Sequence, residues 1–354
     1  MTIKRVCMVG AGRVGRLHTS NLAEQLGGRA RVTALVDPDV QAAGRLAAEF
    51  AVAKTYGSLA QALADQSFDG AVITTPTFTH RDLAVTALEA GLDVHLEKPM
   101  AMNLVECAAI AEALQASGRR LQLGFMRRFD PAFEAGAALL LSGEIGQPMI
   151  IKSLTHGPGL PPPWANDIRT SNGLIAEVCS HDLDTVNWFA ASPAREITVK
   201  VANFKGRERG VESANFYDTM LATVVFESGA LASVAGVCPA DYGYDARVEV
   251  TATKGMMQVG QTGPGGLAAV KAGAGVSASR VYSSWRERFA EAYRREMSGF
   301  ADVMEGGQPR VGAEAGAEAV ALVVAGVQSL LSGRTVALSE VTANPATPDW
   351  QKAL

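Results

Sequence analysis

Through the first third of the chain, short apolar runs alternate with segments in which apolar residues recur at helical spacing. The helical segments include residues 40–50, 83–90 and 104–116. Such an alternation is typical of parallel strands joined by crossover helices, so the pattern predicts a doubly wound α/β sheet. The strands that it predicts are residues 6–9, 32–36, 70–74, 93–96 and 121–124.

Beyond residue 124 the pattern changes to strand-like runs that follow one another after short turns. Such a succession favours a mostly antiparallel sheet with one face open. We expect the strands at residues 147–154, 197–204, 216–226, 230–237, 247–253 and 256–259. The helices are expected at residues 129–141, 174–189, 284–304 and 313–331. A proline-rich loop is expected at residues 157–163 and a glycine-rich loop at residues 260–275.

This change of pattern, together with the length of the chain, predicts two domains. The chain has 354 residues, and single hydrophobic cores stop growing at about 250–300 residues. We place the boundary after the last strand of the alternating region. The first domain is then residues 1–124, and the second is residues 125–354.

A glycine turn directly follows the first predicted strand and matches the spacing G-x-G-x-x-G. Gly10 permits the tight turn, Gly12 leaves room for a pyrophosphate, and Gly15 lets the following helix lie close to the strand. Phosphates would then meet the unpaired N–H groups of the helix N-terminus. The residues expected to hold a dinucleotide in this turn are Gly10, Gly12, Arg13, Val14 and Gly15.

Asp37 ends the second predicted strand, about twenty positions beyond the glycines. A carboxylate there can accept hydrogen bonds from the hydroxyls of an adenosine ribose. It would also repel a 2′-phosphate, and no Arg or Lys follows before Arg45. The sequence therefore predicts NAD rather than NADP.

Two further polar clusters fall at the carboxyl ends of predicted strands, where ligands bind in such sheets. One is the run from Thr74 to Thr77, and the other is Glu97-Lys98-Pro99. The Lys98 ammonium could steady a substrate oxygen beside the cofactor. The plain alternative is an exposed lysine with no task, which is the commoner fate of lysines.

Glu177 and His181 stand four residues apart on the predicted helix 174–189, and hence on one face. A carboxylate can fix the tautomer of an imidazole and stabilise its protonated form, which is the arrangement that a general base needs. The alternative is a histidine satisfied in the core. We expect His181 to act as the base and Glu177 to support it.

Composition narrows the classes of partner. Hydrophobic residues make up 48% of the chain, charged residues 19%, and the net charge is −4. No basic block appears, so nucleic acid is not an expected partner.

Apolar stretches such as residues 319–327 are shorter than the roughly 20 residues that span a bilayer. No signal-like N-terminal segment is visible, so we expect no membrane partner and a cytoplasmic protein.

Cysteines and histidines show no spacing typical of metal sites. The four cysteines lack a C-x-x-C pattern, which favours reduced, mostly buried thiols. The histidines share no ligand spacing either, so no metal is expected. They are His18, His80, His95, His156 and His181.

Taken together, these motifs resemble the glucose-fructose oxidoreductase, inositol dehydrogenase and MocA family of nicotinamide-dependent oxidoreductases. The markers are the glycine turn, Thr75-Pro76 followed by His80, Glu97-Lys98-Pro99, and the run from Ser180 to Asp184. Within the family the likeness is strongest to the inositol 2-dehydrogenase branch. The segments that carry it are residues 124–131, 161–163 and 242–245.

The resemblance implies a Rossmann domain joined to an α/β domain with a large, mostly antiparallel sheet, with the substrate between them. It further implies a homo-oligomer packed through the open sheet face, and it makes a cis Lys98–Pro99 bond plausible. Besides the glycine turn and Asp37, the cofactor residues would be Thr74, Thr75, Pro76, His80, Glu97 and Lys98. The substrate residues would be Lys98, Arg127, His156, His181, Tyr242 and Tyr244.

The function expected from these residues is hydride transfer between NAD and a secondary alcohol of a cyclitol, sugar or sugar derivative. Two alternatives stay open: a glycosidase that retains its NAD and oxidises transiently, and a non-catalytic sensor of dinucleotide and sugar. Lys98 together with His181 argues against the sensor. The chain departs from the family in two places, with Glu177 where most relatives carry aspartate and Ala246 where the inositol branch usually has glutamine. Both departures affect whether the substrate is inositol itself.

Overall fold

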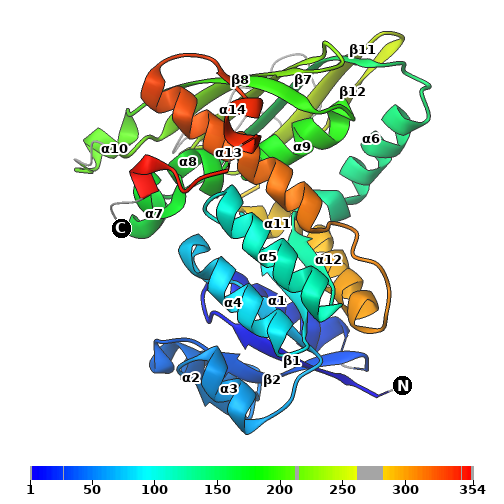
Figure 1. The fold of residues 1–354 in the computed structure, drawn as a ribbon, viewed down its shortest axis with the longest axis vertical. Helices are drawn as coiled ribbons and strands as arrows, with labels where there is room; N and C mark the ends of the chain where they lie inside the picture. Colours follow the sequence, from blue (N-terminus) through cyan, green and yellow to red (C-terminus); the bar gives the residue numbers. More distant parts are fainter. Residues whose placement is uncertain (1, 27, 212–214, 261–281, 344, 352–354) are drawn as a thin grey trace. The chain divides into compact units, whose positions relative to one another are not determined.

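A computed structural model describes residues 2–26, 28–211, 215–260, 282–343 and 345–351 (Figure 1). The chain packs as two compact units. The first comprises Met1–Phe129 and Glu291–Ala317, and the second comprises Asp130–Ala290 and Glu318–Leu354. The packing therefore places residues 291–317 with the first unit, whereas a boundary at residue 124 assigns them to the second domain.

The first unit holds a six-stranded parallel sheet in the order β3-β2-β1-β4-β5-β6. This confirms the predicted doubly wound sheet, with the strand order reversing between β1 and β4. The strands are β1 Lys4–Val9, β2 Ala30–Val36, β3 Lys54–Tyr56, β4 Gly70–Ile73, β5 Asp93–Glu97 and β6 Leu121–Gly124. The helices between them are α1 Arg13–Gln25, α2 Val40–Glu49, α3 Leu59–Asp65, α4 His80–Glu89 and α5 Leu104–Ser117.

A helix from late in the chain completes the core of this unit. The predicted helix 284–304 is broken near Phe289 into α11 (Trp285–Arg288) and α12 (Ala290–Met304). The apolar face of α12 joins the cluster that also contains β1 and α1 side chains. Gly70 of β4 marks the contact, because a Cβ there would lie 2.7 Å from the Met304 sulfur.

The second unit is built on a seven-stranded sheet in the order β12-β11-β7-β10-β9-β8-β13. Its neighbouring strands are antiparallel except β7 and β10, which pair in parallel. The expected mostly antiparallel open sheet is thus confirmed. Its strands are β7 Pro148–His156, β8 Ala194–Ala202, β9 Thr219–Phe226, β10 Leu231–Val237, β11 Asp245–Ala252, β12 Gly255–Val259 and β13 Val336–Ala337.

Helices cover one face of this sheet, and the other face is exposed. Along β9, Met220, Ala222 and Val224 are buried, whereas Leu221 between them is 55% exposed. Figure 1 shows α9 (Ser180–Ala190) and α13 (Ala313–Ser332) along the covered side. The other described α-helices of the unit are α6 Pro131–Leu141, α7 Ile168–Ser171, α8 Gly173–Glu177, α10 Lys205–Glu208, α11 Trp285–Arg288 and α14 Ser339–Thr342.

The prediction of one continuous helix over residues 174–189 is wrong. The structure ends α8 at Glu177 and begins α9 at Ser180. At the break, the N–H groups of Val178 and Cys179 both bond to the carbonyl of Leu174. The Cys179 sulfur then lies against β10 so closely that a Cβ on Gly236 would be 2.2 Å away. The break thus coincides with close packing of Cys179 on the sheet.

Two further expectations concern α13 and the glycine-rich loop. Helix α13 is 20 residues long and apolar enough to cross a membrane by length and composition, but 61% of its most apolar stretch is buried inside the protein. It thus packs as a core helix. The loop expected at residues 260–275 lies outside the described residues from 261 onward.

Candidate cofactor and active site

The glycine turn between β1 and α1 has the close contacts that its sequence predicts. Gly10 has φ +106°, a left-handed conformation that side chains rarely adopt. A Cβ on Gly15 would lie 2.0 Å from the carbonyl oxygen of Gly10, whereas a Cβ on Gly12 would meet nothing within 4 Å. Among the described residues, no side chain caps the N-terminus of α1. The turn therefore combines a tight helix–strand contact with open space beside free backbone donors, which fits a pyrophosphate.

Two alanine substitutions should separate these two roles. Gly15→Ala forces a methyl group against backbone, so we expect the free energy of unfolding to fall by about 3 kcal/mol or more. Gly12→Ala adds its methyl to open space, so its melting temperature should match the wild type while its affinity for NADH weakens. Thermal unfolding and NADH titration of both variants test this pair. Equal NADH affinity in Gly12→Ala and wild type would contradict the placement of the pyrophosphate.

Asp37 and Thr74 tie the glycine turn to the neighbouring strands. One carboxylate oxygen of Asp37 accepts from the N–H of Ala11 at 2.8 Å, and the other accepts from the N–H of Asp39 at 2.9 Å. The Thr74 hydroxyl donates to the carbonyls of Val9 and Gly10. Asp37 thus holds the glycine turn against the loop that follows β2. Its contact with a ribose stays a prediction.

His80 connects the loops that follow β4 and β5. Its Nδ1 lies 2.7 Å from the carbonyl oxygen of Pro99, and its Nε2 lies 2.9 Å from that of Thr75. Burial lowers the pKa of His80, and the two backbone hydrogen bonds oppose that shift. His80 is 1% exposed, so it acts here as a brace between two loops expected to line the cofactor groove.

Lys98 follows β5 in a turn that the side chain of Glu97 holds through a hydrogen bond. The Lys98–Pro99 peptide bond is cis, as the resemblance suggests. Lys98 is partly exposed, whereas Glu97 is 8% exposed. The carboxylate of Glu97 accepts from the backbone N–H of Lys98 at 3.3 Å. It also packs against Gly124, where a Cβ would lie 2.9 Å from the carboxyl carbon.

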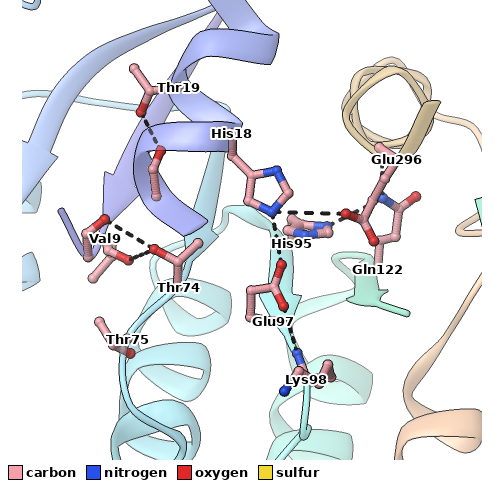
Figure 2. A network of polar contacts seen from close by, with 12 residues as sticks. Val9, His18, Thr19, Thr74, Thr75, His95, Glu97, Lys98, Gln122 and Glu296 are labelled. Carbon is pink, nitrogen blue, oxygen red and sulfur yellow. Dashed lines mark hydrogen bonds and ion pairs between the residues drawn. The ribbon is translucent and has the colours of Figure 1, made fainter. Parts of the chain in front are cut away.

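Glu97 belongs to a buried cluster that sequence spacing did not reveal (Figure 2). Ligand-type atoms of four side chains from three elements lie within 4.8 Å of one another. The prediction that the histidines form no metal-ligating group considered only spacing along the chain, and the fold brings two of them together with two carboxyl groups. The members are His18, His95, Glu97 and Glu296.

In the second unit, His181 lies in the first turn of α9 and is 8% exposed. Glu177, four residues earlier, is the last residue of α8 and is partly exposed. The break between the two helices removes the argument that helical spacing places both on one face. Asp182 anchors α9 to the sheet, because its carboxylate accepts from the hydroxyls of Ser153 and Thr155 at 2.5 and 2.6 Å.

A second polar group of this unit lies at the adjoining ends of β7 and β11. His156 and Asp245 are partners in the strand register. Tyr242 contacts Nδ1 of His156 and donates from its hydroxyl to Asp245 at 3.2 Å. Burial lowers the pKa of His156 and raises that of Tyr242. Two predicted substrate residues, His156 and Tyr242, therefore form one hydrogen-bonded group.

The remaining predicted substrate residues are buried. Tyr244 is 5% exposed and packs edge-to-face on Phe289 in the second unit. Arg127 is 1% exposed, in a 3-10 helix, Met126–Phe129, of the first unit. The low exposure of both is an observation that sequence reasoning did not anticipate, and their contact with substrate stays a prediction.

Comparison with known proteins agrees with this geometry. Residues 4–125 match an oxidoreductase family with an NAD-binding Rossmann fold, and residues 133–258 match the C-terminal domain of the same family. The chain belongs to the GFO/IDH/MocA family. It is therefore an oxidoreductase with an NAD-binding Rossmann domain, as the motifs predict.

Several relatives of this GFO/IDH/MocA protein carry inositol dehydrogenase names. The scyllo-inositol 2-dehydrogenase (NAD(+)) of Bacillus subtilis is 30% identical over 309 residues, covering 86% of this chain and 87% of that protein. The inositol 2-dehydrogenase of Acidothermus cellulolyticus is 30% identical, with 94% of each chain covered. Among solved structures, myo-inositol dehydrogenase from Corynebacterium glutamicum has a TM-score of 0.81 at 30% identity, covering 98% of this chain and all of that one.

Proposed function

We propose that the protein oxidises a secondary alcohol of an inositol-like cyclitol with NAD. The observation that carries the proposal is Lys98, held at the carboxyl end of β5 in a turn braced by Glu97 and His80. The likeness to inositol dehydrogenases over nearly the whole chain supports the substrate class. A structure of myo-inositol dehydrogenase from Lactobacillus casei, solved with NAD(H) and myo-inositol, matches with a TM-score of 0.82 at 26% identity, over 99% of this chain and all of that one.

In the proposed reaction His181 accepts the proton of the substrate hydroxyl, and the Lys98 ammonium stabilises the charge that develops on the oxygen. NAD, when bound, supplies the acceptor for the hydride that leaves the carbinol carbon. A role for Glu177 beside the protonated imidazole rests on its position, where most relatives carry aspartate, and not on helical spacing. The His156–Tyr242 pair offers polar tips for the other hydroxyls of the ring.

A substrate panel tests the proposal. Inositols, aldoses, anhydrosugars and amino-cyclitols are each assayed with NAD and with NADP for reduced nicotinamide. We expect turnover of at least one inositol and a higher kcat/KM with NAD, because Asp37 favours a ribose hydroxyl and repels a 2′-phosphate. Higher kcat/KM with NADP would overturn the cofactor assignment. Cleavage of glycosides with no net NADH would indicate the NAD-retaining glycosidase instead.

The expected homo-oligomer also stays a proposal. Apolar side chains on the outer face of the sheet support it, since Ile150 and Leu231 are register partners that are 41% and 50% exposed. Apolar area of this kind on an open sheet often marks an interface.

A further inference from the structure

One imidazole in the core of the first unit faces two carboxyl groups (Figure 2). His18 of α1 places its Nε2 2.9 Å from Oε1 of Glu97, at the end of β5, and 3.9 Å from Oε2 of Glu296 on α12. His18 and Glu296 are fully buried. Because the shorter contact is a hydrogen bond and the longer one is not, the single Nε2 donor serves Glu97.

Glu296 is left without such a donor. Among the described residues, neither of its carboxyl oxygens has a hydrogen-bond partner. An ionised carboxylate in that position would be buried, without a hydrogen-bond donor and close to the charge of Glu97, with only the His18 ring 3.9 Å away, which is strongly unfavourable. Burial, and next the charge of Glu97, raise the pKa of Glu296 well above its ordinary value. The group must therefore be neutralised by a proton or by a bound cation.

His95, the fourth member of the cluster, favours a proton over a cation on Glu296. Its ring orientation can be assigned from Gln122, which lies beside it. The side-chain nitrogen of Gln122 donates to the backbone carbonyl of Glu296 at 2.9 Å, which fixes the orientation of the amide. The same nitrogen lies 3.4 Å from Nδ1 of His95, so Nδ1 accepts and Nε2 carries the ring proton. Burial lowers the pKa of His95 to about 3, so this ring is neutral. Its Nε2 then offers no lone pair to a metal ion.

We propose that Glu296 is a neutral carboxylic acid and that, with His18, it positions Lys98 by keeping Glu97 as the one ionised carboxylate of the cluster. Glu97 receives the His18 donor on one oxygen and the N–H of Lys98 on the other. Burial opposes ionisation of Glu97, but the hydrogen bond and charge of His18, and then the charge of Lys98, hold its pKa below the ordinary value. The proposal rests on the proposed role of Lys98.

The charge state of Glu296 can be tested without any reaction. Glu296→Gln copies the neutral acid, so the infrared spectrum of the wild type at neutral pH should contain a carboxylic-acid carbonyl band that the variant lacks. A group whose pKa is raised by folding loses stabilisation as pH increases, about tenfold in the folding equilibrium per pH unit between its unfolded and its folded pKa. The melting temperature of Glu296→Gln should therefore exceed that of the wild type by a margin that widens with pH.

The control for this experiment is Glu112→Gln, which changes an exposed glutamate of the same unit and should show neither effect. Two outcomes would contradict the assignment of a proton to Glu296. One is a wild-type spectrum without the carbonyl band. The other is a stoichiometric metal ion in the purified protein that Glu296→Gln loses together with its stability.

The positioning role is tested with His18→Phe, which keeps an aromatic ring and removes the donor to Glu97. We expect kcat to fall by about tenfold or more, since hydrogen bonds to charged groups are among the stronger ones, while Kd for NADH and the KM of the alcohol stay within about threefold. Unchanged kcat in His18→Phe, when Lys98→Met is inactive, would overturn the positioning role. An active Lys98→Met would instead refute the proposed function.

Discussion

Replacing Lys98 by methionine should lower kcat for alcohol oxidation by about 10²-fold or more, because one well-placed electrostatic contact to the reacting oxygen is worth at least that much. The ammonium acts mainly on charge that develops in the transition state, so the Kd for NADH should change little. Methionine keeps the length and the apolar stem of the side chain. Steady-state kinetics and NADH titration of the two proteins measure both quantities.

Lys152→Met is the matched control, since Lys152 is an exposed lysine of β7 paired with Glu249. It should leave kcat unchanged. Activity of Lys98→Met within about threefold of wild type would remove Lys98 from the mechanism, because that change is far smaller than the loss of one such contact.

Substitution of His181 by alanine should lower kcat/KM by about 10² to 10⁴-fold, the range for loss of a general base. In the wild type the rate of oxidation should rise with pH as the imidazole loses its proton, since only the neutral ring can accept the hydroxyl proton. The pH–rate profile of His181→Ala should lack this rising limb. If the limb survives unchanged, the base lies elsewhere, and Lys98 becomes the first candidate.

Glu177 should shift the position of that limb. A nearby carboxylate favours the imidazolium form, so Glu177→Gln should move the apparent pKa of the rising limb to lower pH. The rate should also fall as the ring orientation loosens. Glu177→Asp restores the residue usual in the family and should change the ranking of substrates more than the affinity for NADH. An unchanged limb in Glu177→Gln would separate Glu177 from the base.

Local patterns were enough to predict most of the fold, and each failure has an identifiable structural basis. The strand β3, Lys54–Tyr56, was not predicted. Two of its three residues are exposed, so it contains no apolar run that would indicate a strand. The helix break after Glu177 coincides with close packing of Cys179 against Gly236, far along the chain. The parallel pairing of β7 with β10 is likewise invisible in the strands themselves, because an alternating strand pairs in either direction.

The candidate site divides in the same way. The glycine turn and Asp37 are local motifs, and the structure gives them the expected geometry. The contacts of His18 with Glu97 and Glu296 join three elements that are widely separated in sequence, so no rule based on residue spacing finds them. A usable signal was present nonetheless. A histidine one turn beyond the glycines, on the buried side of an amphipathic helix, requires a polar partner in the core.

The return of α12 to the first unit has a consequence for synthesis of the protein. Met297, Phe300 and Met304 fill the same core as Val6 and Leu22, so a nascent chain that has emerged only as far as residue 129 still exposes that apolar surface. Domains generally fold in order from the N-terminus during translation. Here the second unit is almost fully translated before the first can close. We therefore expect the Rossmann segment to depend on chaperones while it waits on the ribosome, and an isolated fragment ending at residue 129 to aggregate.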